Sequence, residues 1–244
     1  MPSIQKHVLC LSPSGLHRMA YQEWGAGDNP RVLVCVHGLT RNARDFDRLA
    51  AALAADYRVI CPDVVGRGQS DRLRDPSAYV VPQYVADMVT LLARLDVERV
   101  DWLGTSMGGL IGMALAAQPG SPIGRLVLND VGPWITRESL DRIGEYVGSD
   151  PDWATLDEAE RYVRTISAPF GALSDADWRH LTETSVVQRT DGRWAFRYDP
   201  AIAAPFRAAF ADHDIDLWPL YQAIACPTLV IRGAESDLLT RETW

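Results

Sequence analysis

The segment Gly104-Thr105-Ser106-Met107-Gly108-Gly109 constrains the fold of this chain more than any other part of its sequence. An apolar run that predicts a strand comes directly before it, and a stretch rich in Ala and Gly that predicts a helix follows. A serine in so sharp a turn projects its hydroxyl above the sheet. Side chains two residues before and after it would collide with the neighbouring strand and helix, and glycine at 104 and 108 removes that obstacle. The pattern therefore predicts a strained turn that presents Ser106 as a nucleophile.

Strand and helix patterns alternate on both sides of this turn. An alternating segment at 16–25 predicts an antiparallel outer strand. Buried strands are predicted from short apolar runs at residues 31–36, 57–61, 99–103, 125–128 and 227–231. Helices are predicted at residues 45–55, 81–95 and 107–117, the second of them with an apolar face made of Val85, Met88, Val89 and Leu92. This alternation predicts the α/β class, with a mostly parallel sheet and helices on both of its faces.

The alternation stops in the segment 133–216. No convincing buried strand is visible there, and amphipathic helical pieces carry many aromatic side chains. The strand pattern resumes at residues 227–231. We therefore predict an α/β core made of residues 1–132 and 217–244, with a helical cap formed by residues 133–216.

Composition and charge exclude several classes of protein. The formal net charge of -8 argues against binding to nucleic acid or to an anionic membrane surface. The apolar runs have strand length and fall far short of the roughly 20 residues of a spanning helix. The four cysteines, Cys10, Cys35, Cys61 and Cys226, have no metal-ligand spacing. They predict free thiols in the reducing cytoplasm, and we expect no metal and no cofactor.

Three further motifs accompany the Ser106 turn: His37-Gly38-Leu39-Thr40, the D-x-x-G-x-G-x-S loop at 63–70, and the segment 231–237. Together with the turn they resemble the α/β-hydrolase superfamily over essentially the whole chain. The resemblance implies an oxyanion hole formed by the backbone N–H groups of Leu39 and Met107, and a structural role for His37. It also implies a cap above the serine. Branches of this fold that use an Asp nucleophile, such as haloalkane dehalogenases and epoxide hydrolases, are disfavoured by serine at position 106.

Two aspartates compete for the acid of a Ser-His-Asp triad. Asp237 follows the last predicted strand and has the chain order, serine before acid, that the superfamily uses. Asp130 follows the preceding strand of the sheet and is the alternative. A loop aspartate also commonly caps a backbone turn, and that simpler role suits Asp130 better than Asp237. Asp237 is therefore the preferred acid.

A general-base histidine is harder to find in this sequence. Serine needs such a base because it is a poor nucleophile at neutral pH. In the superfamily this base follows the acid, yet all five histidines of the chain precede Asp237. His213 is a weak candidate and His180 a weaker one. We expect the histidine beyond residue 244. This sequence would then be either a fragment of a longer chain or an inactive form. Such a form would expose one sheet edge, through which a homodimer is expected to pair.

These features predict a serine hydrolase of a small ester, lactone or related carbonyl compound, which acts through an acyl-enzyme. The aromatic cap would provide a pocket for an apolar acyl group. Two alternatives stay open. One is a small-molecule binding protein without catalysis, and the other is an acyltransferase or perhydrolase that uses the same serine.

Overall fold

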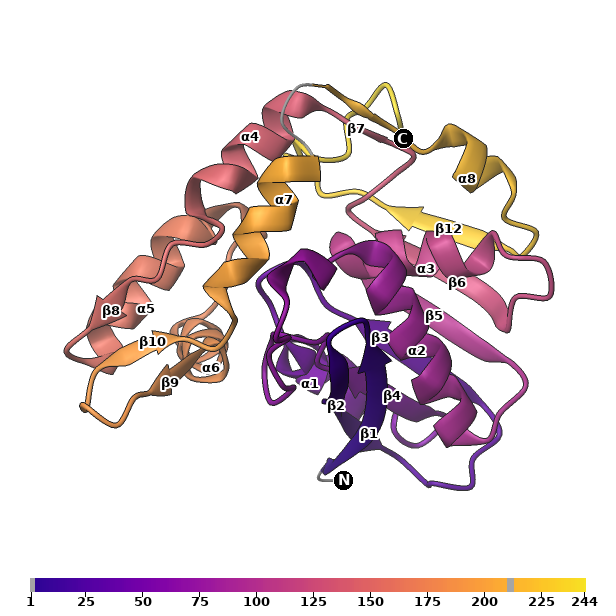
Figure 1. The fold of residues 1–244 in the computed structure, drawn as a ribbon, viewed down its shortest axis with the longest axis horizontal. Coiled ribbons are helices and arrows are strands. Elements are labelled where there is room, and N and C mark those ends of the chain that lie inside the picture. The colour runs from indigo at the N-terminus through magenta and orange to yellow at the C-terminus, as the bar shows by residue number, and fades with distance from the viewer. Residues whose placement is uncertain (1–2, 210–212) are drawn as a thin grey trace.

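A seven-stranded, mostly parallel sheet forms the core of the computed structural model, which describes residues 3–209 and 213–244 (Figure 1). Its strand order is β1-β2-β4-β3-β5-β6-β12. The strands are β1 (Ile4–Ser12), β2 (Gly15–Trp24), β3 (Val32–Val36), β4 (Arg58–Pro62), β5 (Val100–Thr105), β6 (Ile123–Asn129) and β12 (Thr228–Ile231). Strand β2 pairs antiparallel with both β1 and β4, while β4, β3, β5, β6 and β12 pair in parallel. The predicted fold class is confirmed. The antiparallel strand predicted at 16–25 is β2, but it is not the outermost strand, because β1 pairs with its other side and forms the sheet edge.

Strand β3 shows why both faces of this sheet need helices. All five of its side chains are buried, and successive side chains point to opposite faces. Leu33 and Cys35 pack with the 3-10 helix Ala43–Phe46 and with α1 (Asp47–Leu53) on one face. Val32, Val34 and Val36 join the larger core on the other face, beneath α2 (Val81–Leu95), α3 (Met107–Ala116) and α8 (Trp218–Gln222).

Helix α2 has the predicted length, but its buried face differs from the predicted one. Val89, expected in the core, is 50% exposed. The buried face contains two polar side chains, Gln83 and Asp87, beside Tyr84, Met88, Leu91, Leu92 and Leu95. Met88 and Leu92 are buried as predicted, but a face chosen from apolar residues alone is rotated toward Val89, because it leaves out Gln83 and Asp87.

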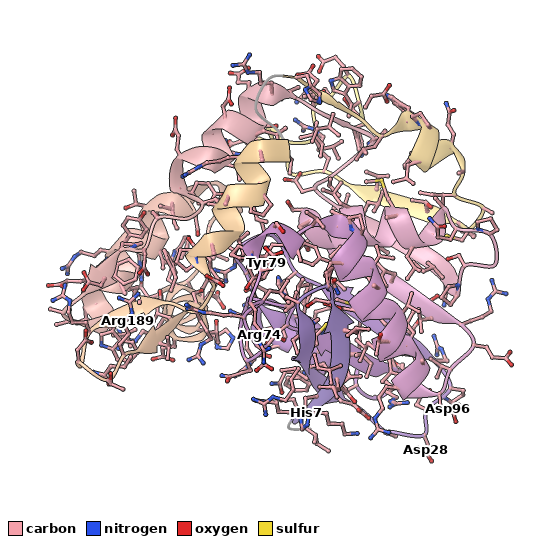
Figure 2. All side chains as sticks on the ribbon, in the orientation of Figure 1. His7, Asp28, Arg74, Tyr79, Asp96 and Arg189 are labelled. Atoms are coloured by element: carbon pink, nitrogen blue, oxygen red, sulfur yellow. The ribbon has the colours of Figure 1, made fainter. Side chains whose placement is uncertain are left out.

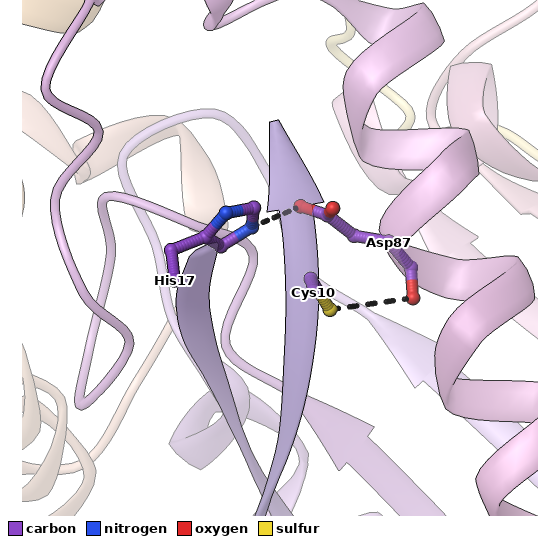
Figure 3. A group of neighbouring side chains, drawn as sticks. All are labelled: Cys10, His17 and Asp87. Carbon is purple, nitrogen blue, oxygen red and sulfur yellow. Dashed lines mark hydrogen bonds and ion pairs between the residues drawn. The ribbon is translucent and has the colours of Figure 1, made fainter. Parts of the chain in front are cut away.

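The buried Asp87 is explained by its partners in the N-terminal hairpin (Figure 3). Its carboxylate lies 3.1 Å from His17 Nε2 and accepts a hydrogen bond of 2.8 Å from Gln83. Cys10 lies opposite His17 across β1 and β2, and its thiol contacts the backbone carbonyl of Asp87. One possible ligand atom from each of Cys10, His17 and Asp87 thus lies within 4.8 Å of the others. Sequence spacing gave no sign of this cluster, because its members come from three separate elements.

The segment between β6 and α8 consists mainly of helices that lie to one side of the sheet (Figure 1). They are α4 (Arg137–Tyr146), α5 (Leu156–Ile166), α6 (Asp175–Ser185) and α7 (Ala203–Ala209). Side chains of Thr136, Thr155 and Ser174 cap the first three of them. Trp153, Tyr162 and Phe196 pack against one another between these helices. The boundaries 133–216 for a cap remain a prediction.

Short strands also occur in this region, where the sequence indicated none. Strands β8 (Asp152–Trp153), β10 (Trp194–Phe196) and β9 (Val186–Gln188) form a small sheet, and β7 (Trp134–Ile135) pairs with β11 (Ile215–Asp216). They escaped prediction because two or three residues are too few to show an alternating pattern.

The described part of the chain contains no helix that is both long and apolar enough to cross a membrane. Strand β12 forms one edge of the main sheet, and two of its side chains, Leu229 and Ile231, are 57% and 43% exposed. All four cysteines are free thiols.

The buried His17–Asp87 contact yields a prediction for stability. Replacing Asp87 with Ala leaves the His17 ring without its acceptor in a buried setting, so we expect a loss of about 3 kcal/mol in the free energy of unfolding. Urea denaturation measures it. Val89→Ala on the same helix is the matched control and should change that free energy by less than about 1 kcal/mol. Equal effects of the two substitutions would contradict the assignment.

Candidate active site

Ser106 occupies the sharp turn between β5 and α3, with φ 51 and ψ -116. Such a backbone conformation is strained for any residue with a side chain. The two glycines have the role expected of them. A Cβ atom on Gly104 would overlap the carbonyl oxygen of Gly108, and a Cβ atom on Gly108 would overlap the carbonyl oxygen of Val36. The turn can form only because neither residue has a side chain.

A cavity of about 820 Å³ lies above this turn, between the sheet and the helical region. It brings together the residues singled out in the sequence: Leu39, Ser106, Met107, Asp130 and Asp237. Each follows the carboxyl end of a strand, namely β3, β5, β6 or β12, and these four strands are neighbours in the sheet. Much of the rest of the lining is apolar and comes from both the α/β core and the helical region between β6 and α8. It includes Val81, Leu110, Leu140, Ile143, Phe196 and Phe206.

The loop after β3 approaches the serine closely. A Cβ atom added to Gly38 would lie 3.8 Å from Ser106 Cβ. The neighbouring His37 is buried, and both of its ring nitrogens are engaged. Nε2 accepts a hydrogen bond of 2.9 Å from the Val64 N–H, which assigns the proton to Nδ1, and Nδ1 donates to the Gly38 carbonyl at 2.7 Å. Burial lowers the pKa of His37 to about 4, although the hydrogen bond to Gly38 opposes this. His37 is thus a neutral loop-shaping residue without a nitrogen free to act as a base.

Arg67 supports the loops of the site without lining the cavity, and the sequence analysis missed it. Its buried guanidinium donates from Nε to the Leu39 carbonyl at 2.8 Å and from Nη1 to the Tyr84 hydroxyl at 3.0 Å. Its Nη2 lies 3.5 Å from Met107 Sδ. One cation therefore holds the two segments whose N–H groups are expected to form the oxyanion hole. An arginine in a loop normally predicts exposure, and only its place between Gly66 and Gly68 in the D-x-x-G-x-G-x-S motif indicated otherwise.

The two candidate acids have different partners. Asp237 forms a bidentate ion pair with Arg142 of α4. Its two carboxylate oxygens accept hydrogen bonds from Arg142 Nε and, at 2.9 Å, from Arg142 Nη2. Asp130 has a positive φ of 57 and accepts a hydrogen bond of 2.9 Å from the Gly233 N–H, which joins the loops after β6 and β12. The carboxylate of Asp130 thus stabilises a backbone connection, as expected of a turn-capping residue. The choice of Asp237 as the triad acid remains a prediction.

None of the five histidines, all within the described residues, lines the cavity. His213 is exposed. His180 on α6 lies with its Nε2 3.3 Å from Asp47 Oδ2, beside α1. The sheet, the loops and the serine turn are therefore in place without a histidine beside Ser106.

Tyr79 joins the two regions at the cavity wall (Figure 2). Its hydroxyl donates to Asp199 Oδ2 at 2.7 Å and accepts a hydrogen bond of 2.8 Å from the Leu73 N–H. Burial, and next the hydrogen bond to Asp199, raise the pKa of this hydroxyl, so it stays protonated as the donor. The helical region is thereby fixed over the sheet.

The fold and the serine turn are typical of hydrolases, and comparison with known proteins identifies the family. The sequence model described as the alpha/beta hydrolase fold matches residues 31–241. The chain belongs to this family.

Individual relatives agree with this assignment. A 3-hydroxybutyrate-oligomer hydrolase of Cupriavidus necator is 57% identical over 243 residues, which cover 97% of this chain and 83% of that protein. The crystal structure of an alpha/beta hydrolase from Novosphingobium aromaticivorans is 40% identical, with a TM-score of 0.87 over 99% of this chain and 85% of the other. A putative hydrolase from Rickettsia typhi is 35% identical, with a TM-score of 0.90 over 100% of this chain and 86% of the other.

The close approach at Gly108 predicts the effect of one added methyl group. Gly108→Ala forces the start of α3 away from β3, so we expect a loss of more than about 3 kcal/mol in the free energy of unfolding, measured by urea denaturation. The control is Gly124→Ala in β6, where an added Cβ atom makes only ordinary contacts of 3.6 Å or more. It should cost less than about 1 kcal/mol. Similar losses in both variants would show that the Ser106 turn tolerates a side chain at position 108.

The lowered pKa of His37 predicts a specific pH dependence. The pKa of His37 is about 4 in the folded chain and 6.5 in the unfolded chain, so unfolding takes up a proton at pH values between 4 and 6.5. Stability therefore falls as the pH falls from 6.5 to 4, by about 3 kcal/mol in total. Unfolding free energies measured from pH 7 to 4.5 should fall less steeply for His37→Gln than for the wild type.

The nearby Asp63 makes the opposite contribution to the pH dependence of the free energy of unfolding. Burial raises its pKa to about 6, so protonation of Asp63 favours the folded state as the pH falls below 6. This contribution is present in both proteins and cancels from their difference. Identical pH slopes for the wild type and His37→Gln would contradict the burial of a neutral His37.

Proposed function

We propose that this chain carries the nucleophile, oxyanion hole and acid of a serine esterase that acts through an acyl-enzyme. The observation that carries the proposal is the strained Ser106, which lines a largely apolar cavity together with Leu39 and Met107. A residue is held in such a conformation only where the surrounding structure determines it, and such positions cluster at active sites. The pairing of a strand-to-helix serine turn with the Gly38 loop favours acyl transfer over simple binding.

In the proposed reaction, the Ser106 hydroxyl attacks the ester carbonyl and transfers its proton to a histidine base. The N–H groups of Leu39 and Met107 stabilise the oxyanion of the tetrahedral intermediate. The base then returns the proton to the leaving alcohol, and the acyl group remains on Ser106. Water attacks this acyl-enzyme by the same route, releases the carboxylic acid and restores the serine.

The acid of the triad in this proposal is Asp237, which lines the same cavity as Ser106. It would orient the histidine and stabilise its charged form. Asp130, whose Oδ1 accepts the Gly233 N–H, is the alternative acid, and Asp237 is preferred because it follows the last strand of the sheet. Since no histidine of the chain lines the cavity, an external imidazole is a direct way to test whether the rest of the machinery functions.

The substrate class follows from the cavity and from the relatives. Apolar side chains of both regions suit aliphatic acyl chains, and the volume of about 820 Å³ accommodates several ester units. The relative at 57% identity hydrolyses 3-hydroxybutyrate oligomers, as its name states. We therefore propose short oligoesters of 3-hydroxyalkanoic acids as substrates of this chain.

Covalent labelling tests the nucleophile. A fluorophosphonate probe should label the wild type at Ser106, as located by peptide mass spectrometry, and added imidazole should accelerate labelling by roughly tenfold or more, within the range of general-base catalysis. Ser106→Ala should abolish the label. Ser167→Ala is the matched control, because Ser167 also lines the cavity but lies outside the serine turn.

Two other outcomes are informative. Labelling that needs no imidazole and disappears in His213→Ala would show that His213 reaches the serine as the base. Absence of label on Ser106 at any imidazole concentration, in a folded protein, would overturn the proposed nucleophile.

A further inference from the structure

Arg142 is a cation on the wall of an otherwise largely apolar cavity. It projects from α4, and its Nε and Nη2 atoms engage the carboxylate of Asp237 along one edge of the guanidinium. A guanidinium has five N–H donors in a planar fork, so a second edge, formed by Nη1 and the other Nη2 proton, is available for a second carboxylate. Within residues 3–209 and 213–244, Nη1 has no hydrogen-bond partner. Its side chain is 47% exposed.

The second arginine on the cavity wall, Arg41, is in a different situation. Its Nε and Nη2 atoms bind Asp45, and its Nη1 atom donates to Ser185 Oγ at 2.8 Å. Its donors are thus largely occupied by the protein itself. Of the two cations that line the cavity in the described chain, Arg142 is the one with a free guanidinium edge.

The side chain of Tyr146 lies near the charges of Arg142, Arg41 and Asp237 in the cavity. Tyr146 lies one turn after Arg142 on α4 and lines the same cavity. Burial raises its pKa, while the charges of Arg142 and Arg41 lower it and that of Asp237 raises it. Arg142, Arg41 and Asp237 therefore line the same cavity as a half-buried tyrosine, beside which a ligand anion would be partly desolvated.

We propose that Arg142 is a specificity-determining residue that binds the terminal carboxylate of a hydroxyacid oligoester. This inference rests on the proposed function, because it concerns the substrate of the Ser106 site. Every linear oligomer of a 3-hydroxyacid ends in one free carboxylate, which neutral esters and lactones lack. A paired fork is the strongest geometry by which a protein holds a carboxylate. Arg142 thus favours charged oligoesters over uncharged esters of the same length.

The chemistry also gives this carboxylate a defined place in the reaction. In a linear dimer, attack on the ester carbonyl leaves the hydroxyl-bearing unit on Ser106, while the leaving alcohol carries the free carboxylate. The unit bound by Arg142 therefore departs first, with its proton supplied by the base, and the neutral acyl-serine remains. The Asp237 edge of the guanidinium is unaffected by this exchange.

Binding to a variant that cannot react is the test, so that the result is independent of turnover. In Ser106→Ala, the dissociation constants of the linear 3-hydroxybutyrate dimer and of its methyl ester are measured by calorimetry. We expect the free acid to bind about tenfold more tightly, a modest ratio because Arg142 is half exposed. In Ser106→Ala/Arg142→Met this preference should disappear, and Arg142→Lys should restore part of it.

A matched control comes from the same helix. Arg137 on α4 also forms an ion pair, with Asp141, but does not line the cavity. Ser106→Ala/Arg137→Met should keep the full preference for the acid. An unchanged acid-to-ester ratio in the Arg142→Met variant overturns the inference and would leave Arg142 as a partner of Asp237 alone.

The same experiment separates this inference from the proposed function. Labelling of Ser106 and binding of the methyl ester report on the esterase site and do not involve the carboxylate. If both succeed while the acid shows no preference, only the role of Arg142 fails. If neither ligand binds and Ser106 is not labelled, the proposed function itself fails.

Discussion

The contact on which the site depends is the approach of the α3 N-terminus to the end of β3. At Gly108 the helix backbone comes so near the Val36 carbonyl that no side chain fits between them. This approach forces Ser106 into its left-handed conformation and brings the Gly38 loop beside it. Apolar burial on both sheet faces supports it, since β3 is covered by α1 on one side and by α2 and α3 on the other. The strain at one residue is thus maintained by packing across two layers.

Beneath the cavity lies a set of buried polar groups that hold the loops rather than react. Arg67, His37 and Asp63 each bind backbone groups of the loops that follow β3 and β4. Asp63 accepts the Ala43 and Gln69 N–H groups, which compensates for much of the cost of its burial. Such a network needs every partner to be satisfied, so single substitutions within it are expected to disturb loop geometry as well as stability.

The sequence was sufficient for the fold and for the serine turn because both rest on local patterns. Strand and helix periodicity predicted most elements of the core, although not β1 or α8, and the glycines around Ser106 predicted the turn from sterics alone. It was insufficient wherever a polar side chain is buried by distant partners. Asp87 and Gln83 on α2, and Arg67 in its loop, carry charge or amide groups that normally indicate exposure. Apart from the Gln83–Asp87 and Arg67–Val65 hydrogen bonds, which are local, their partners lie 17 to 77 positions away, a relation that one sequence does not display.

The way in which the helical region is attached has a consequence for the diversification of such enzymes. The floor of the cavity belongs to the ends of four sheet strands, whereas much of the wall belongs to the helical region. Apart from apolar packing, the two regions meet through polar contacts along their boundary, among them those of Tyr79 with Asp199, Asn42 with Thr184 and Arg142 with Asp237. Mutation can therefore remodel the wall while the floor keeps its geometry. A chain built in this way can acquire a new substrate in small steps without first losing its chemistry.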